Sequence, residues 1–89
     1  MKNKTNLPKW FNGTIYDKGE TVTNPFSGEK YKLTNLELSM YDFIIGSQMT
    51  IELMGGVFSG KTFDQQDLMR KGLDWFRKHN AKAYMVLLD

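Results

Sequence analysis

The chain contains no cysteine, so its 89 residues must be held together by packing alone. A domain of this length buries only roughly 60–65% of the surface that its unfolded chain exposes, which leaves a narrow margin of stability. Disulfide bonds, thiolate zinc sites and cysteine nucleophiles are all excluded. Because small secreted domains usually depend on disulfides, we expect a cytoplasmic protein.

The composition is that of a folded globular domain. Apolar residues make up 40% of the chain, aromatic residues 13% and charged residues 25%, unlike the charge-rich, aromatic-poor composition of disordered chains. No stretch approaches the ~20 apolar residues of a membrane span, so we predict no membrane partner. Residues 1–9 are polar and basic, without the apolar segment of a secretion signal. We expect a flexible basic tail over 1–9 and a single compact domain over 10–89.

The N-terminal third is rich in turn-forming residues that separate short runs of β-formers. Lys18-Gly19 predicts a hairpin turn that places Ile15 opposite Val22, with apolar groups on one face. Residues 29–33 alternate between polar and apolar and predict a further strand. This region is therefore predicted to form a β-hairpin or meander.

A long helix is predicted to begin after Thr34, because Thr34 and Glu37 fit a capping box. Its apolar residues cover most of its circumference, which is typical of a buried core element. Residues 48–53 alternate as a strand would, yet their apolar members also continue the helical spacing. We favour a helix that ends at Gly55-Gly56, with a glycine in the left-handed conformation.

A second helix is predicted over about 63–78, with Thr62 and Gln65 forming another capping box. Residues 83–88 are apolar on both alternating faces, which predicts a buried strand. The sequence therefore predicts an α+β fold: an N-terminal β-hairpin or meander, two packed helices and a short C-terminal strand.

Residues 55–62 (Gly-Gly-Val-Phe-Ser-Gly-Lys-Thr) match the pattern of a phosphate-binding loop. In such a loop, glycines let backbone N–H groups surround a phosphate, the lysine neutralises its charge and the hydroxyl holds Mg²⁺. The candidate phosphate ligands are Gly55, Gly60, Lys61 and Thr62.

The residues on either side of this motif favour a different interpretation. Gln48, Thr50 and Glu52 interrupt the apolar run that a central parallel strand would need, and Asp64 and Asp67 would oppose a polyanion at the start of the following helix. We therefore predict a glycine-rich connection between helices and expect no cofactor. Phosphate or nucleotide binding remains the alternative.

No other set of residues suggests catalysis. The only histidine, His79, lies in the predicted last turn of a charged helix, where a capping role is expected. No cluster of histidine and acidic residues has metal-ligand spacing, so we predict no catalytic residue and no metal site. The sequence thus favours a non-enzymatic protein and leaves catalysis as an open alternative.

Basic residues in the C-terminal third offer a further alternative. They flank Trp75 and Phe76, and cations interleaved with aromatic side chains can bind nucleic acid. We interpret them as a solvated basic face and keep nucleic-acid binding as an alternative. The residues are Arg70, Lys71, Arg77, Lys78 and Lys82. The six methionines, which suit adaptable interfaces, favour self-association into a homo-oligomer.

Several short stretches are similar to sequences of small uncharacterised proteins of marine phages, cyanophages among them. They are Thr-Asn-Pro-Phe-Ser-Gly-Glu at 23–29, Tyr-Asp-Phe-Ile at 41–44, Leu-Asp-Trp-Phe at 73–76 and the ending at 84–89. The resemblance implies a viral accessory protein in the host cytoplasm and transfers no catalytic residue. We therefore expect a non-enzymatic interaction or structural module that self-associates.

Overall fold

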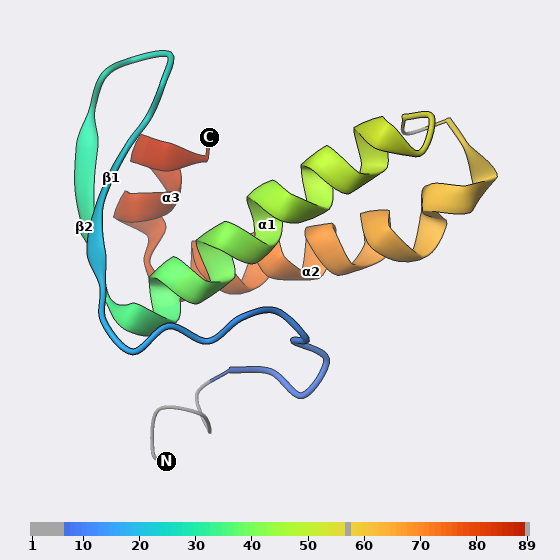
Figure 1. Ribbon diagram of the computed structural model, residues 1–89. Coiled ribbons are helices and arrows are strands. Elements are labelled where there is room, and N and C mark those ends of the chain that lie inside the picture. The colour runs from blue at the N-terminus through green and yellow to red at the C-terminus, as the bar shows by residue number, and fades with distance from the viewer. Residues whose placement is uncertain (1–6, 57, 89) are drawn as a thin grey trace.

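The computed structural model describes residues 7–56 and 58–88. An irregular segment leads into two short strands, and three α-helices follow them (Figure 1). In chain order the elements are β1 (Glu20–Thr23), β2 (Lys30–Leu33), α1 (Asn35–Leu53), the 3-10 helix η2 (Gly60–Thr62), α2 (Phe63–His79) and α3 (Ala81–Leu87). The predicted α+β class is confirmed, as are the N-terminal hairpin and the two packed helices.

The hairpin is real, but its turn is not where the sequence suggested. β1 and β2 are antiparallel, with Val22 opposite Tyr31, and the chain reverses through the loop at 24–29. Asn24 shapes that loop, because its side-chain oxygen accepts hydrogen bonds from the backbone N–H groups of Phe26 and Ser27. The loop at 24–29, and not Lys18-Gly19, therefore joins the two strands of the hairpin.

Gly19 has a different role from the predicted one. A Cβ atom at this position would collide with the carbonyl oxygen of Leu33, so glycine permits close approach of two backbone segments rather than a turn. Ile15 and Tyr16 lie outside the sheet. The predicted pairing of Ile15 with Val22 is therefore wrong, whereas the strand predicted over 29–33 is observed as β2.

Helix α1 begins and ends as predicted. The Thr34 hydroxyl accepts from the Glu37 N–H at 3.3 Å, and the Glu37 carboxylate accepts from the Thr34 N–H at 2.9 Å, which completes the capping box. Residues 48–53 are helical. The end is a Schellman motif: the Gly56 N–H donates to the Ile51 carbonyl at 2.8 Å, and Gly55 has a φ of 109°.

Helices α1 and α2 lie side by side and form the main packing layer (Figure 1). Gly72 lets them approach closely, since a Cβ there would lie 3.0 Å from Ile44 Cγ1 and 3.4 Å from Met40 Sδ. Phe76 of α2 is fully buried against this seam. The core comprises Leu7, Leu33, Leu36, Leu38, Met40, Ile44, Phe76, Ala83 and Leu87.

The predicted C-terminal strand is wrong, because this segment is helix α3. Asn80 caps it by accepting from the Ala83 N–H at 3.1 Å. Ala83 and Leu87 are buried while Met85, which a strand would place on their side, is exposed. A short apolar run does not by itself distinguish a strand from a helix; here the Asn80 cap and the packing of α3 on β2 and α2 favour the helix.

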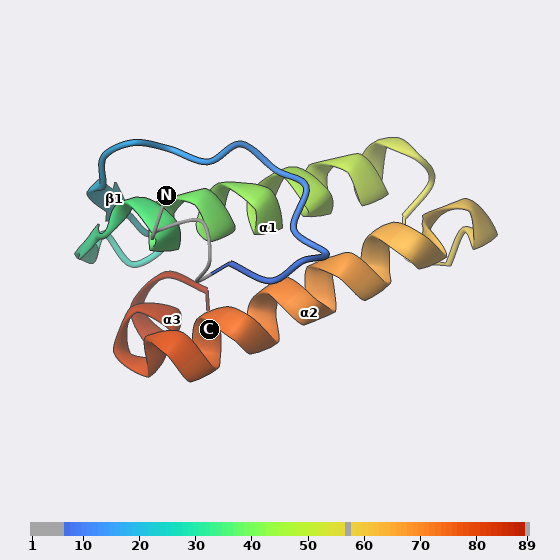
Figure 2. The same cartoon turned by 90° about the horizontal axis from the view of Figure 1, so that it is seen from below.

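The segment before the hairpin covers one side of the helical pair (Figure 2). Trp10 and Phe11 pack on Phe43 of α1, with ring centroids 6.0 and 5.2 Å apart. Leu7 lies in the expected tail but belongs to the core, whereas the tail residues 1–6 lie outside the described part of the chain. Among the described residues, no helix is long and apolar enough to cross a membrane.

Candidate functional site

The segment 55–62 is a closed connection between helices in the part that the structure describes, which excludes Val57. It follows a helix rather than a strand. Five of its N–H groups have partners within the chain. Gly55 and Gly56 donate to the end of α1, Ser59 and Thr62 donate to the Gly56 and Ser59 carbonyls, and Lys61 donates to Ser59 Oγ. These donors therefore do not converge on a site for a phosphate.

The side chains of the motif are also arranged unlike those of a phosphate loop. Thr62 is fully buried, and its hydroxyl lies 2.9 Å from the Ser59 carbonyl oxygen and 3.1 Å from that of Gly56. Gln66 Nε2 donates to the same hydroxyl at 2.6 Å. Lys61 is exposed, and Gly60 begins η2. This arrangement fits the predicted helix connection and offers no hydroxyl for Mg²⁺.

The predicted capping box of α2 is wrong. Thr62 makes no side-chain cap hydrogen bond; its hydroxyl oxygen accepts from Gln66 Nε2 and its single proton is directed at the Ser59 and Gly56 carbonyls. Gln65 donates instead to Ser47 Oγ at 2.8 Å and so joins α2 to α1. Ser59 performs the capping one turn earlier by accepting from the Lys61 N–H.

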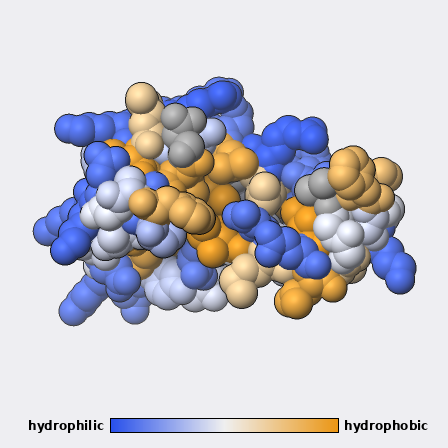
Figure 3. All heavy atoms as spheres, turned by 90° about the horizontal axis from the view of Figure 1, so that it is seen from above, coloured by the Kyte–Doolittle hydropathy of each residue, from blue (hydrophilic) through white to orange (hydrophobic). Residues whose placement is uncertain are grey.

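Large apolar side chains are exposed where the chain passes from α1 to α2. Leu53 is 85% exposed, Phe58 98% and Phe63 66%. Figure 3 shows apolar atoms gathered at this end of the molecule, with polar atoms around them. We call this surface the apolar tip; it comprises Met49, Leu53, Met54, Phe58 and Phe63.

Charged side chains of both signs accompany the apolar tip. Glu52 lies in the last turn of α1, Lys61 in η2 and Asp64 in the first turn of α2, and all three are exposed. None of the three forms an ion pair with another residue in the described ranges. The tip therefore offers an acid and a base that are both available to a partner.

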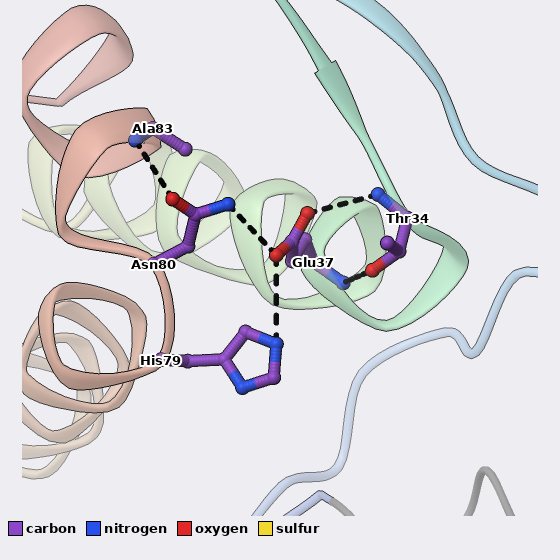
Figure 4. A network of polar contacts seen from close by, with 5 residues as sticks. All are labelled: Thr34, Glu37, His79, Asn80 and Ala83. Atoms are coloured by element: carbon purple, nitrogen blue, oxygen red, sulfur yellow. Dashed lines mark hydrogen bonds and ion pairs between the residues drawn. The ribbon is translucent and has the colours of Figure 1, made fainter.

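The opposite end of the helical pair is closed by a buried polar network (Figure 4). Glu37 is buried, and its carboxylate accepts from the Thr34 N–H and from Asn80 Nδ2, both at 2.9 Å. His79 Nε2 lies 3.5 Å from Glu37 Oε2, and its ring stacks on Trp75 with centroids 4.5 Å apart. Asn80 also caps α3, so the network joins α1, α2 and α3.

This glutamate–histidine pair is better suited to holding the fold than to catalysis. Both carboxylate oxygens of Glu37 already accept hydrogen bonds from the protein. Every buried side-chain nitrogen or oxygen among the described residues has a partner. Nor do these residues contain a group of three histidine or acidic side chains that could hold a metal ion.

Three of the five basic residues singled out in the sequence line one groove, of about 440 Å³. It is lined by residues of α2 and by one residue of α3. We call it the basic groove; its lining residues are Arg70, Lys71, Leu73, Asp74, Arg77 and Tyr84. Lys78 lies beside it through its contact with Asp74, whereas Lys82 is exposed on α3 and does not line it.

The aromatic residue in the groove is not one that the sequence indicated. Phe76 is fully buried and Trp75 is stacked on His79, so neither presents a free ring beside the arginines. Tyr84 takes that place because 83–88 is a helix. The missed signal was the helix cap at Asn80, which turns Tyr84 toward the groove.

The exposure of the tip residues could have been predicted from the sequence. Phe58 lies in a glycine-bounded turn and Leu53 in the last turn before it. A large apolar side chain in such a connection has little chance of reaching the core of a two-helix layer. Their positions in the sequence therefore carried the signal.

A second hollow, of about 360 Å³, lies between β1 and the start of α1. Within it the Tyr16 hydroxyl donates to Asp42 Oδ2 at 3.1 Å. That hydrogen bond, together with the negative charge of Asp42, raises the pKa of Tyr16. The phenol consequently keeps its proton and is poorly suited to act as a base.

Comparison of the chain with protein-family models, with curated proteins and with solved structures finds no match. The evidence on function lies in the geometry of the apolar tip, the buried network and the basic groove.

Proposed function

We propose that the protein is a non-enzymatic interaction module that self-associates through the apolar tip. The observation that carries the proposal is the exposure of Leu53, Phe58 and Phe63 at one end of the molecule. Exposed apolar patches of this kind mark interaction sites in soluble proteins. The resemblance to short phage proteins supports a small accessory protein, working in the host cytoplasm through contacts rather than chemistry.

The size of the tip suits a modest protein interface. Its five side chains together expose on the order of 600 Å², near the upper end of the largest patch on a typical monomer. A stable interface buries about 800 Å² on each partner. The tip can therefore form the apolar centre of an interface, with the surrounding polar residues completing its rim.

The charges beside the tip favour a second copy of the chain as the partner. In a two-fold contact the same surface meets itself, so any residue of one copy can face a different residue of the other. Glu52 and Lys61 flank the tip without partners among the described residues. A two-fold dimer can place Glu52 of each copy against Lys61 of the other, which pairs both charges.

The first test measures the oligomeric state by analytical ultracentrifugation over a wide concentration range. Phe58→Glu should weaken self-association about tenfold or more, because it places a charge at the centre of the interface. Phe26→Glu is the matched control: Phe26 is 97% exposed but lies in the hairpin loop at the other end. A strictly monomeric wild-type chain, or equal weakening by the two variants, would contradict the proposal.

The second test examines the two-fold arrangement by charge reversal. Glu52→Lys and Lys61→Glu should each weaken self-association a few-fold, since each replaces two cross-copy attractions with repulsions. An equimolar mixture of the two variants should associate again, because both pairs in the mixed dimer then have opposite charges. Failure of the mixture to recover would exclude this arrangement even if the Phe58 result holds.

A further inference from the structure

We propose that the basic groove binds a phosphate-bearing nucleotide unit of single-stranded nucleic acid, with phosphates on Arg70 and Arg77 and a base against Tyr84 and Leu73. This site is separate from the apolar tip, and the proposal does not depend on self-association. It rests on three features of the groove: its free guanidinium donors, its net positive charge and its apolar and aromatic wall.

The arginines are placed so that both can bind an anion. Arg70 and Arg77 are seven residues apart on α2, which is about two helical turns, or roughly 10 Å. They therefore lie on the same face of the helix, on either side of Leu73 and Asp74. Two cations at this spacing, with an apolar floor between them, suit an extended ligand that carries more than one negative charge.

Arg70 is the arginine with the most donors available. Within 7–56 and 58–88 no carboxylate lies at ion-pair distance from it. Arg77 uses one nitrogen, Nη2, to donate to Asp74 Oδ1 at 2.7 Å. A guanidinium has five N–H donors in a planar fork that matches phosphate oxygens, so Arg77 can still hold a phosphate on its other edge.

The groove keeps a net positive charge although Asp74 lines it. Arg70, Lys71 and Arg77 supply three positive charges against one negative, a net of +2. At the edge, Lys78 lies 3.1 Å from Asp74 Oδ2 and Asp67 lies 3.3 Å from Lys71 Nζ, so these two further charges offset each other and the net stays at +2. Hydrogen bonds from Lys78 and Arg77 lower the pKa of Asp74, so this carboxylate stays ionised and occupied by its own partners.

The wall of the groove distinguishes a nucleotide from a simple anion. Tyr84 presents a half-buried ring from α3, and Leu73 contributes apolar surface from α2. No hydrogen bond joins the Tyr84 hydroxyl to another residue in the described part of the chain. Aromatic rings beside cationic side chains stack on bases of any sequence, and a volume of 440 Å³ lies within the range of about 300–1,000 Å³ typical of ligand sites.

The test uses the full chain and a fluorescently labelled, mixed-sequence DNA single strand of about 12 nucleotides, followed by anisotropy. We expect binding that weakens steeply between about 50 and 200 mM salt. Arg70→Gln should weaken it about fivefold or more and lower the salt dependence by about one phosphate contact. Tyr84→Leu should weaken it to a similar extent without changing the salt dependence, because stacking releases no counterion.

Lys30→Gln serves as the matched control, since it removes one exposed positive charge on β2, outside the groove. Thermal melting of each variant shows whether it is folded. If wild-type protein does not bind the strand at low salt, or if Lys30→Gln weakens binding as much as Arg70→Gln, the proposal is overturned.

Competition identifies the ligand. Displacement by an unlabelled strand but not by poly-glutamate supports a nucleotide ligand, whereas equal displacement by poly-glutamate overturns it in favour of a general polyanion surface. Displacement by adenosine monophosphate at comparable concentration also supports the site and shows that a free mononucleotide suffices. Displacement by the strand alone shows that adjacent phosphates are required.

Discussion

The two ends of the helical pair differ in which side chains they bury: one end buries a polar group, and the other exposes apolar groups. At one end a carboxylate is buried, and Glu37 has protein donors on both oxygens. At the other end Leu53 and Phe58 face solvent. A buried carboxylate is tolerated where each of its oxygens accepts a hydrogen bond. An exposed apolar side chain contributes no burial free energy until a partner covers it. The first end therefore holds the fold, and the second is available for binding.

The largest expected effect compares two leucines, one near each end. Leu33 is 1% exposed and Leu53 is 85% exposed. Leu33→Ala should lower the free energy of unfolding by about 2–4 kcal/mol, because it leaves a cavity in the core, whereas Leu53→Ala should change it by no more than about 0.5 kcal/mol. Urea denaturation followed by tryptophan fluorescence measures both. Similar losses in the two variants would show that the tip contributes to stability.

The buried network provides the second comparison. Glu37→Ala removes the acceptor of the Thr34 N–H and the Asn80 amide, and we expect a loss of about 2–3 kcal/mol from the lost cap and the unsatisfied donors. Glu52→Ala, an exposed glutamate of the same helix, should cost no more than about 0.5 kcal/mol. The same denaturation experiment applies. Equal stability of the Glu37→Ala and Glu52→Ala variants would show that the buried network contributes no more to folding than an exposed glutamate does.

Two glycines of the helix connection should respond with opposite signs. Gly55 has a φ of 109°, so Gly55→Ala forces a strained backbone and should cost about 1–2 kcal/mol. Gly60 begins η2 with open space around its Cβ position, so Gly60→Ala should stabilise by up to about 1 kcal/mol. Melting temperatures suffice for this comparison. Stabilisation by both substitutions would mean that the Schellman geometry is not required.

The smallest effect concerns the solvent-exposed carboxylate of Asp74. Hydrogen bonds from Lys78 and Arg77 lower its pKa below the ordinary 3.8, so the stability from this cluster is present above pH 3.8 and is lost as the pH falls through the lowered pKa. An NMR titration should show that Lys78→Gln raises the pKa of Asp74. An unchanged pKa in that variant would show that the ion pair is not maintained in solution.

Local chemistry made much of the fold predictable. The capping box at Thr34 and the glycine stop at Gly55 depend on hydrogen bonds over a few residues, so the sequence carries them directly. The helical assignment of 48–53 followed from the same signals. By contrast, the hairpin turn predicted at Lys18-Gly19 is not formed; the strands are joined at 24–29, and Leu33 at the end of β2 is buried in the core. Sequence patterns cannot rank turns whose difference lies in distant packing.

The basic groove was also predictable from the sequence only in part. The basic residues of α2 were visible in the sequence. Their ion pairs with Asp67 and Asp74 join residues three or four apart on one helix, so the helical spacing could have predicted these pairs as well. The ring at the groove comes from Tyr84 rather than Trp75 or Phe76. Tyr84 was missed because 83–88 was predicted to be a strand, whereas Tyr84 lies in helix α3.

By itself the sequence determined where the two long helices begin and end and that 55–62 connects them, since these depend on local hydrogen bonding and backbone conformation. Only the tertiary structure decided that Glu37 accepts a hydrogen bond from Asn80, that Tyr84 lies beside the arginines of α2 and that Gly19 meets the backbone of Leu33. Those outcomes depend on contacts between residues far apart in the chain. The free energy of such contacts comes from burial and pairing that no local pattern records.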